Sequence, residues 1–257
     1  MTAGGPTVAV RVPAHPVARA LIEAVGRPVV APSANRSGYV SPTRVEHVQG
    51  LWPRSQVLVL DGGPCEVGLE STVVAVGERS LSVLRPGVVG ARRLAEVAGV
   101  PVEPRARGDR REDLGVPAEA GRAGPGAPVG SPGLVGPHYQ PRAPVVLVRT
   151  AEQAGSALAS ASQRRQRAVV LGPPGGDFQA PSGHEVLAMP GEGRAYARVL
   201  YEALRRADEA GPGLIVVFEP TQPGEVWDAV RERLGRASGG GLGGASVGSS
   251  GGAGTAG

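Results

Sequence analysis

The stretch PVVLVRTAEQAGSALASASQRRQRAVVLG, residues 144–172, decides the fold class of this chain. It opens with a β-branched run, continues through a helical segment at residues 151–165 and closes with a second apolar run at residues 168–172. Short apolar runs on either side of a helix of this length predict two parallel strands joined by a crossover. The fold class that follows is α/β.

The same alternation continues toward the C-terminus. Strands are predicted at HEVLAM (184–189) and GLIVVFEP (213–220), and helices at residues 194–211 and 224–237. Residues 144–236 therefore read as a small Rossmann-like parallel α/β domain. Its first strand is not followed by GxGxxG, so we expect no dinucleotide site there. Residues 237–257 contain ten glycines in 21 positions, a composition that predicts a disordered tail.

The segment before this domain, residues 103–143, is predicted to be a flexible linker that ends in an interdomain HYQP segment. Hydrophobic periodicity is lost between about residues 102 and 131, where arginine, glycine and proline dominate. The arginines alone would suit RNA binding. Acidic residues interleave with them, however, and favour a solvated tether.

Residues 1–102 show a second α/β pattern. Helices are predicted at residues 15–26 and 90–99, with a shorter one from Ser41 to about Gln49. Strands are predicted at TVAVRV (7–12), 28–31, VLVLD (57–61), STVVAV (71–76) and SVLR (82–85). We read this region as part of a twisted-sheet domain.

Composition narrows the chemistry. Apolar residues make up 41% of the 257 residues and aromatic residues only 3%, so the cores must consist of aliphatic side chains. Every basic residue is an arginine, which leaves no lysine to bind a phosphate as a point charge. The net charge of +4 permits contact with nucleotides or RNA without demanding it. The single cysteine, Cys65, excludes an intramolecular disulfide, and the four scattered histidines predict no metal cluster.

The sequence also bears on location. The N-terminus lacks the charged and apolar regions of a signal peptide, and no apolar run approaches the roughly 18 residues of a membrane span. We expect a cytoplasmic protein without membrane contact.

The loop APSANRSGYVSPT, residues 31–43, is the first candidate site. A strand that runs into small hydroxyl residues, with a helix start at Ser41, can present N–H groups and hydroxyls to an anion. The candidate nucleotide cradle consists of Ser33, Asn35, Ser37, Ser41 and Thr43. The alternative is an ordinary Ser/Pro-rich loop whose side chains cap turns.

Arginines and a glycine turn complement this loop. Arg11 lies on the first predicted strand, Arg36 lies in the loop, and Arg85 precedes Pro86-Gly87. Such arginines can direct a planar fork at phosphate or carboxylate, although most arginines simply lie at the surface. In GGPCEVGLESTVV (62–74) the glycines allow close backbone approach, and Ser71 is placed to bind a polar substrate.

Taken together, these segments resemble the threonylcarbamoyl-AMP synthases in their long form, which have a YrdC-like catalytic domain followed by a C-terminal domain. The resemblance covers nearly everything except residues 103–130 and the tail. It rests on TVAVRVPAH (7–15), APSANRSGYVSPT (31–43), GGPCEVGLESTVV (62–74), LRPG (84–87), SPGLVGPHYQPRAP (131–144) and GEVWDAVRERLGRA (224–237).

The resemblance implies a nucleotidyltransferase reaction. L-Threonine and bicarbonate form N-carboxythreonine, which attacks the α-phosphorus of ATP to give L-threonylcarbamoyl-AMP and pyrophosphate, with Mg²⁺ on the phosphates. A partner complex then transfers the threonylcarbamoyl group to adenosine 37 of tRNA, and the resemblance allows contact with tRNA or double-stranded RNA. Catalysis of this kind depends on positioning and charge stabilisation.

The resemblance also implies site residues. Thr7, Ser33, Ser41 and Arg85 match positions that contact ATP, and Tyr139 lies in the segment that closes over the nucleotide. Arg11, Ala31 and Ser71 match positions around L-threonine. No catalytic residue and no metal ligand is assigned.

The sequence departs from the family pattern at its beginning. The family starts with a further segment that holds a Lys/Arg motif for the triphosphate, and the present sequence contains no such motif. We therefore expect an N-terminally incomplete synthase domain of doubtful activity by itself. The alternatives are a non-catalytic nucleotide- or RNA-binding remnant of the fold and a structural remnant without function.

Overall fold

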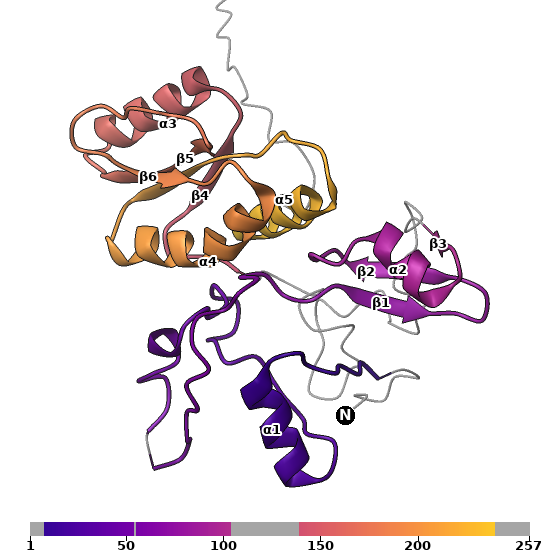
Figure 1. The fold of residues 1–257 in the computed structure, drawn as a ribbon. Coiled ribbons are helices and arrows are strands. Elements are labelled where there is room, and N and C mark those ends of the chain that lie inside the picture. Colours follow the sequence, from indigo (N-terminus) through magenta and orange to yellow (C-terminus); the bar gives the residue numbers. More distant parts are fainter. Residues whose placement is uncertain (1–7, 54, 104–138, 240–257) are drawn as a thin grey trace, which may run out of the picture.

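A computed structural model describes residues 8–53, 55–103 and 139–239 (Figure 1). We call residues 8–103 the N-terminal lobe and residues 139–239 the C-terminal lobe. The predicted domain boundaries at residues 102, 143 and 236 stay a prediction. The predicted linker residues 104–138 and tail residues 240–257 lie outside the described part. No helix among the described residues has the length and apolar character needed to cross a membrane.

The C-terminal lobe has the predicted parallel sheet. Its strands are β4 (Val145–Val148), β5 (Ala168–Pro174), β6 (Glu185–Met189) and β7 (Leu214–Phe218), in the order β4-β7-β5-β6 with every neighbouring pair parallel. The helices are α3 (Ala151–Gln163), α4 (Gly193–Glu209) and α5 (Glu225–Ala237). The helix predicted at residues 151–165 begins at the expected place because the Thr150 side chain accepts the N–H of Gln153 and caps it.

Two cores cover the two faces of this sheet. On β5, Ala168 and Val170 pack with Leu158 of α3, whereas Val169 and Leu171 pack with α4 and α5. This alternation is what a strand buried on both faces requires. Figure 1 shows α3 on the outer face of the sheet and α4 and α5 on the face toward the N-terminal lobe.

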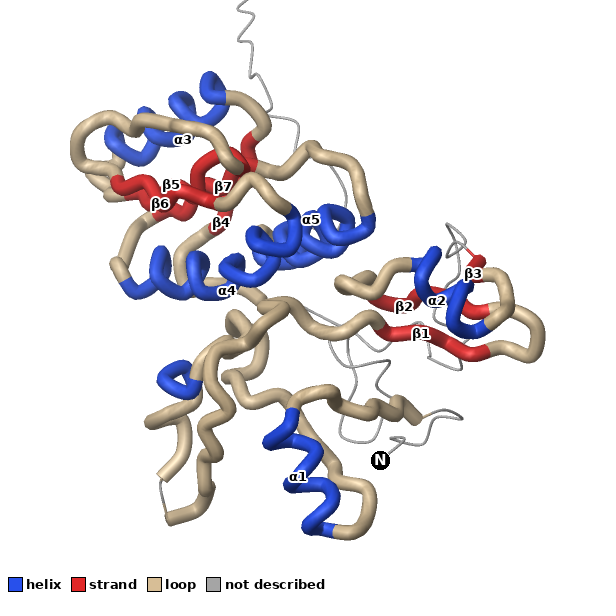
Figure 2. Tube along the Cα trace, in the orientation of Figure 1, coloured by secondary structure: helices blue, strands red, loops and turns tan. Residues whose placement is uncertain are grey.

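The N-terminal lobe contains fewer regular elements. A three-stranded sheet has the order β1-β2-β3, formed by β1 (Val73–Val76), β2 (Leu81–Arg85) and β3 (Val102–Glu103). Strands β1 and β2 are antiparallel, β2 and β3 are parallel, and α2 (Ala91–Ala98) follows β2. Helix α1 (Pro16–Val25) ends at Gly26 in the left-handed conformation, as predicted. The mixed architecture confirms the predicted α/β class (Figure 2).

Three predicted strands of the N-terminal lobe are wrong. The described residues in 8–12, 28–31 and 57–61 are not strands, and the helix predicted from Ser41 to Gln49 is reduced to the 3-10 turn η1 (Val45–His47). A strand needs a neighbour for its backbone hydrogen bonds, and these segments have none among the described residues. Apolar side chains of these segments are exposed to solvent, for example Val12 at 89% and Leu58 at 85%.

Candidate functional site

The two lobes meet where α4 and α5 lie against the segments before and after η1. Val40 and Leu69 of the N-terminal lobe are buried in the same cluster as Leu200 and Leu204 of α4. Tyr39 donates its hydroxyl to Asp208 at 2.7 Å. The contact is therefore both apolar and polar, and it includes Tyr39 and Val40 at the end of the predicted Ser-rich loop.

Gly68 allows a close backbone approach between the lobes. Its φ is +79°, and a Cβ built there would lie 2.4–2.5 Å from the backbone of Ala197 and Arg198 on α4. No residue with a side chain fits such a position without displacing the helix. The close backbone approach predicted for the glycine turn is thus found at Gly68.

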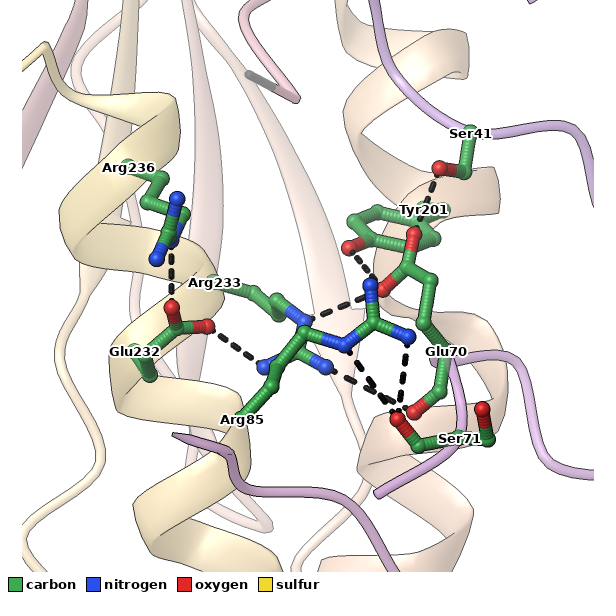
Figure 3. Close-up of polar contacts among 8 residues, drawn as sticks. All are labelled: Ser41, Glu70, Ser71, Arg85, Tyr201, Glu232, Arg233 and Arg236. Carbon is green, nitrogen blue, oxygen red and sulfur yellow. Dashed lines mark hydrogen bonds and ion pairs between the residues drawn. The ribbon is translucent and has the colours of Figure 1, made fainter. Parts of the chain in front are cut away.

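Glu70, two residues further on, binds side chains from both lobes (Figure 3). Its Oε1 accepts the Ser41 hydroxyl at 2.6 Å. Its Oε2 accepts the Tyr201 hydroxyl at 2.9 Å and Nε of Arg233 at 3.0 Å. The carboxylate is therefore held by one donor from its own lobe and two from the C-terminal lobe.

Arg233 is the most buried charge in this arrangement. Its side chain has no exposed area, and it also pairs with Glu232, which in turn binds Arg236. Burial by itself would raise the pKa of Glu70, but Arg233 and the Ser41 hydroxyl hold that pKa below its ordinary value. Glu70 is consequently ionised at neutral pH.

Arg85 and Tyr139 complete the site. Arg85 is 8% exposed and donates Nε and Nη2 to the Ser71 carbonyl oxygen at 3.2 and 3.0 Å. Tyr139 is 5% exposed, stacks on Tyr201 at 5.4 Å and lies 5.9 Å from the Arg233 guanidinium. Burial raises the pKa of the Tyr139 phenol, helped by the nearby Glu70 charge, so the hydroxyl stays protonated.

A second polar group borders the site. Arg205 of α4 donates to the backbone carbonyls of Val40 and Ser41, while Glu202 contacts His47 at 3.2 Å and Arg44 at 3.3 Å. Burial and the positive charge of Arg205 lower the pKa of His47. These contacts fix the backbone on which Ser41 stands.

The structure brings together part of the predicted site. Ser41, Ser71, Arg85 and Tyr139 converge where the lobes meet. Arg11, Ala31 and Ser33 are exposed. Thr7 lies outside the described residues.

Sequence reasoning did not assign roles to Glu70, Tyr201 and Arg233. A signal was present in α5, where Arg233 occupies the apolar stripe that also includes Trp227 and Val230. An arginine on the buried face of a helix needs a buried acceptor. The sequence alone did not show that this acceptor lies 163 positions away at Glu70.

The carboxylates of Glu70 and Glu232 do not suit Mg²⁺. Both oxygens of Glu70 accept protein donors, and both oxygens of Glu232 bind arginines. Within the described ranges no group of three or more His, Cys, Asp or Glu residues is arranged to hold a metal. Magnesium bound here would have to rely on ligands other than these two carboxylates.

Two family models match the chain. One, described as telomere recombination and covering Sua5, YciO and YrdC proteins, matches residues 1–87. The other, described as the C-terminal domain of threonylcarbamoyl-AMP synthase, matches residues 91–239, more than half of the chain. The chain belongs to the threonylcarbamoyl-AMP synthase family.

Relatives of this family match both lobes. The threonylcarbamoyl-AMP synthase of Bacillus subtilis is 32% identical over 247 residues, and that of Pyrococcus abyssi is 33% identical over 245 residues. Each alignment covers 93% of this chain but only 65% and 66% of the two relatives. The chain therefore spans slightly less than two thirds of the length of these curated members.

A solved structure of a family member has the same arrangement. The crystal structure of P. abyssi Sua5 complexed with L-threonine superposes with a TM-score of 0.72 at 32% identity, over 93% of this chain and 66% of that one. The family and the fold class expected from the resemblance are thereby confirmed.

Proposed function

We propose that the protein makes L-threonylcarbamoyl-AMP and pyrophosphate from ATP, L-threonine and bicarbonate. The observation that carries this proposal is the match of both family models to one chain. It is supported by Ser41, Ser71 and Arg85, which come together beside the C-terminal lobe. Arg85, which is assigned to ATP, donates two hydrogen bonds to the backbone carbonyl oxygen of Ser71, which is assigned to threonine. That pairing suits a reaction in which the two substrates join.

The chemistry requires positioning more than covalent catalysis. The amino group of threonine and bicarbonate form N-carboxythreonine with loss of water. A carboxylate oxygen of this species then attacks the α-phosphorus of ATP while the bond to the pyrophosphate oxygen breaks. Arg85 has a buried guanidinium that is already oriented, so its charge can stabilise the phosphates without reorganisation.

The remaining assignments belong to the same proposal. Thr7, Ser33, Ser41 and Tyr139 contact ATP, while Arg11 and Ala31 lie around threonine. Arg11 suits the substrate carboxylate because its fork can bind both oxygens. Mg²⁺ accompanies ATP as its phosphate-bound ion. The product is consumed in the cytoplasm by a complex that modifies adenosine 37 of tRNA, and contact with tRNA or double-stranded RNA forms part of that step.

The test is product formation by the purified protein. With ATP, Mg²⁺, L-threonine and isotopically labelled bicarbonate, a protein that also includes the Lys/Arg segment with which the family begins should release pyrophosphate and form a labelled adenylate with the mass of L-threonylcarbamoyl-AMP. Omitting either threonine or bicarbonate should abolish both signals, and D-threonine serves as the matched control. Pyrophosphate release that does not depend on threonine, or an adenylate without the label, would contradict the proposal.

A further inference from the structure

The Ser41 hydroxyl has one proton, and the structure shows where it goes. Ser41 donates to Oε1 of Glu70 at 2.6 Å, a short distance typical of a hydroxyl bound to a carboxylate. An ionised carboxylate accepts hydrogen bonds and has none to donate. What Ser41 retains for a ligand is therefore a pair of acceptor positions, because its only donor is committed.

The carboxylate that takes this proton is fixed by the C-terminal lobe. Arg233 and Tyr201, 0% and 1% exposed, both donate to the other oxygen, Oε2. Arg233 also points Nη2 at the Glu70 carbonyl oxygen, at 3.5 Å. Oε1 is thereby left for Ser41, and the carboxylate cannot turn without breaking buried contacts.

We propose that Glu70 is a positioning residue, held by Arg233 and Tyr201, that makes the Ser41 hydroxyl an acceptor and so selects a hydrogen-bond donor of the bound nucleotide. This inference rests on the proposed function, because it takes Ser41 as an ATP contact. It excludes a phosphate oxygen as the partner of Ser41, since phosphate oxygens only accept at neutral pH. The donors that ATP offers are the ribose hydroxyls and the adenine amino group.

The C-terminal lobe thus contributes to the nucleotide site without touching the nucleotide. A chain of hydrogen bonds runs from Arg233 of α5 through Glu70 to Ser41. In addition, Arg205 of α4 donates to the backbone carbonyl oxygen of Ser41. Loss of Arg233 should therefore change which nucleotides bind, in addition to weakening the contact between the lobes.

Nucleotide analogues test the polarity of Ser41. We would measure the affinities of ATP, 2′-deoxy-ATP, 3′-deoxy-ATP, inosine triphosphate and pyrophosphate for the wild type and for Ser41→Ala. One of the three analogues should bind the wild type about fivefold more weakly than ATP, the effect of one lost hydrogen bond, and its identity tells which donor is used. In Ser41→Ala that difference should disappear, and pyrophosphate affinity should be unchanged.

Three variants test the positioning role of Glu70. In Arg233→Met the half-buried Glu70 loses its counter-charge, so its pKa rises, and below that pKa the carboxyl group can donate to Ser41. As pH is lowered, the preference of Arg233→Met for ATP over the weak analogue should therefore decrease. The wild type should keep a constant preference over the same pH range, and Arg233→Lys should restore this wild-type behaviour. Tyr201→Phe, which keeps the ion pair, gives a second reading if Arg233→Met does not fold. The matched control is Arg198→Met, an exposed arginine on α4.

The outcomes separate this inference from the proposed function. If ATP binds but Ser41→Ala weakens pyrophosphate as much as ATP, Ser41 contacts phosphate and the inference is wrong while the function stands. Equal affinities of all four nucleotides for the wild type would also overturn it. Failure to bind any nucleotide would remove the proposed function and this inference with it.

Discussion

Replacement of Arg233 by methionine tests the contact between the lobes most severely. Methionine keeps much of the apolar volume but leaves the Glu70 carboxylate without its charged partner. Breaking a buried ion pair from one side typically costs about 3–5 kcal/mol. The Glu70 side chain retains 20% exposure and can recover some hydration, so we expect the lower end, about 3 kcal/mol.

The assay is urea unfolding at pH 7, followed by far-UV circular dichroism, with Arg198→Met as the control. The exposed control should stay within about 0.5 kcal/mol of the wild type. The double variant Arg233→Met/Glu70→Gln should recover more than half of the loss, because the uncompensated charge is gone. A single variant within about 1 kcal/mol of the wild type, or a double variant no more stable than the single one, would refute this reasoning.

The pH dependence gives an independent reading of the same pair. The pKa of Glu70 is lowered in the folded protein, so its stabilising effect is complete above the unfolded value of about 4.3. That effect is lost as pH falls through the lower folded pKa. Between pH 7 and pH 3 the wild type should therefore lose more stability than Arg233→Met, in which this contribution is absent.

Three further predictions concern other residues. Gly68→Ala should destabilise the protein by more than about 2 kcal/mol in the same unfolding assay, because Gly68 has a left-handed φ and its backbone contacts α4. Gly63 also has a positive φ, of +80°, but open space surrounds it, so Gly63→Ala should cost only about 1 kcal/mol. Burial and Arg205 lower the pKa of His47 in the folded protein. The protein should therefore lose stability as pH falls from about 6.5, the unfolded value, through the lower folded pKa. In a pH series of melting temperatures, His47→Gln should remove this part of the loss. Arg11→Lys should raise KM for threonine about tenfold and leave KM for ATP unchanged in steady-state kinetics, because one ammonium cannot reproduce a two-pronged contact; an unchanged threonine KM would remove the assignment.

The parts of the fold that sequence patterns predicted correctly are those stabilised by neighbouring residues. The C-terminal strands alternate with helices whose starts carry local caps, at Thr150 for α3 and Glu192 for α4. In the N-terminal lobe, residues 8–12 and 57–61 have the same β-branched character but no pairing partner among the described residues. The residue types of a segment indicate whether it can form a strand, but whether it does so depends on a neighbouring strand with which it can pair.

The candidate site was predictable only in part, for a related reason. Ser41, Ser71 and Arg85 stand out locally by their residue types and by the turns next to them. Glu70 and Arg233 are ordinary charged residues until the fold brings them together across 163 positions. Tyr139 was assigned through its segment, and the structure adds that it stacks on Tyr201.

The most direct test of the account is calorimetric titration of ATP into the wild type, Arg85→Ala and Arg79→Ala. Arg79 is an exposed arginine in the same β1–β2 hairpin and serves as the matched control. We expect ATP affinity to fall at least about tenfold in Arg85→Ala, as for loss of a preoriented phosphate donor, and to stay unchanged in Arg79→Ala. Circular dichroism must show both variants folded. Equal ATP affinity in wild type and Arg85→Ala would contradict the assignment of this interface as the nucleotide site.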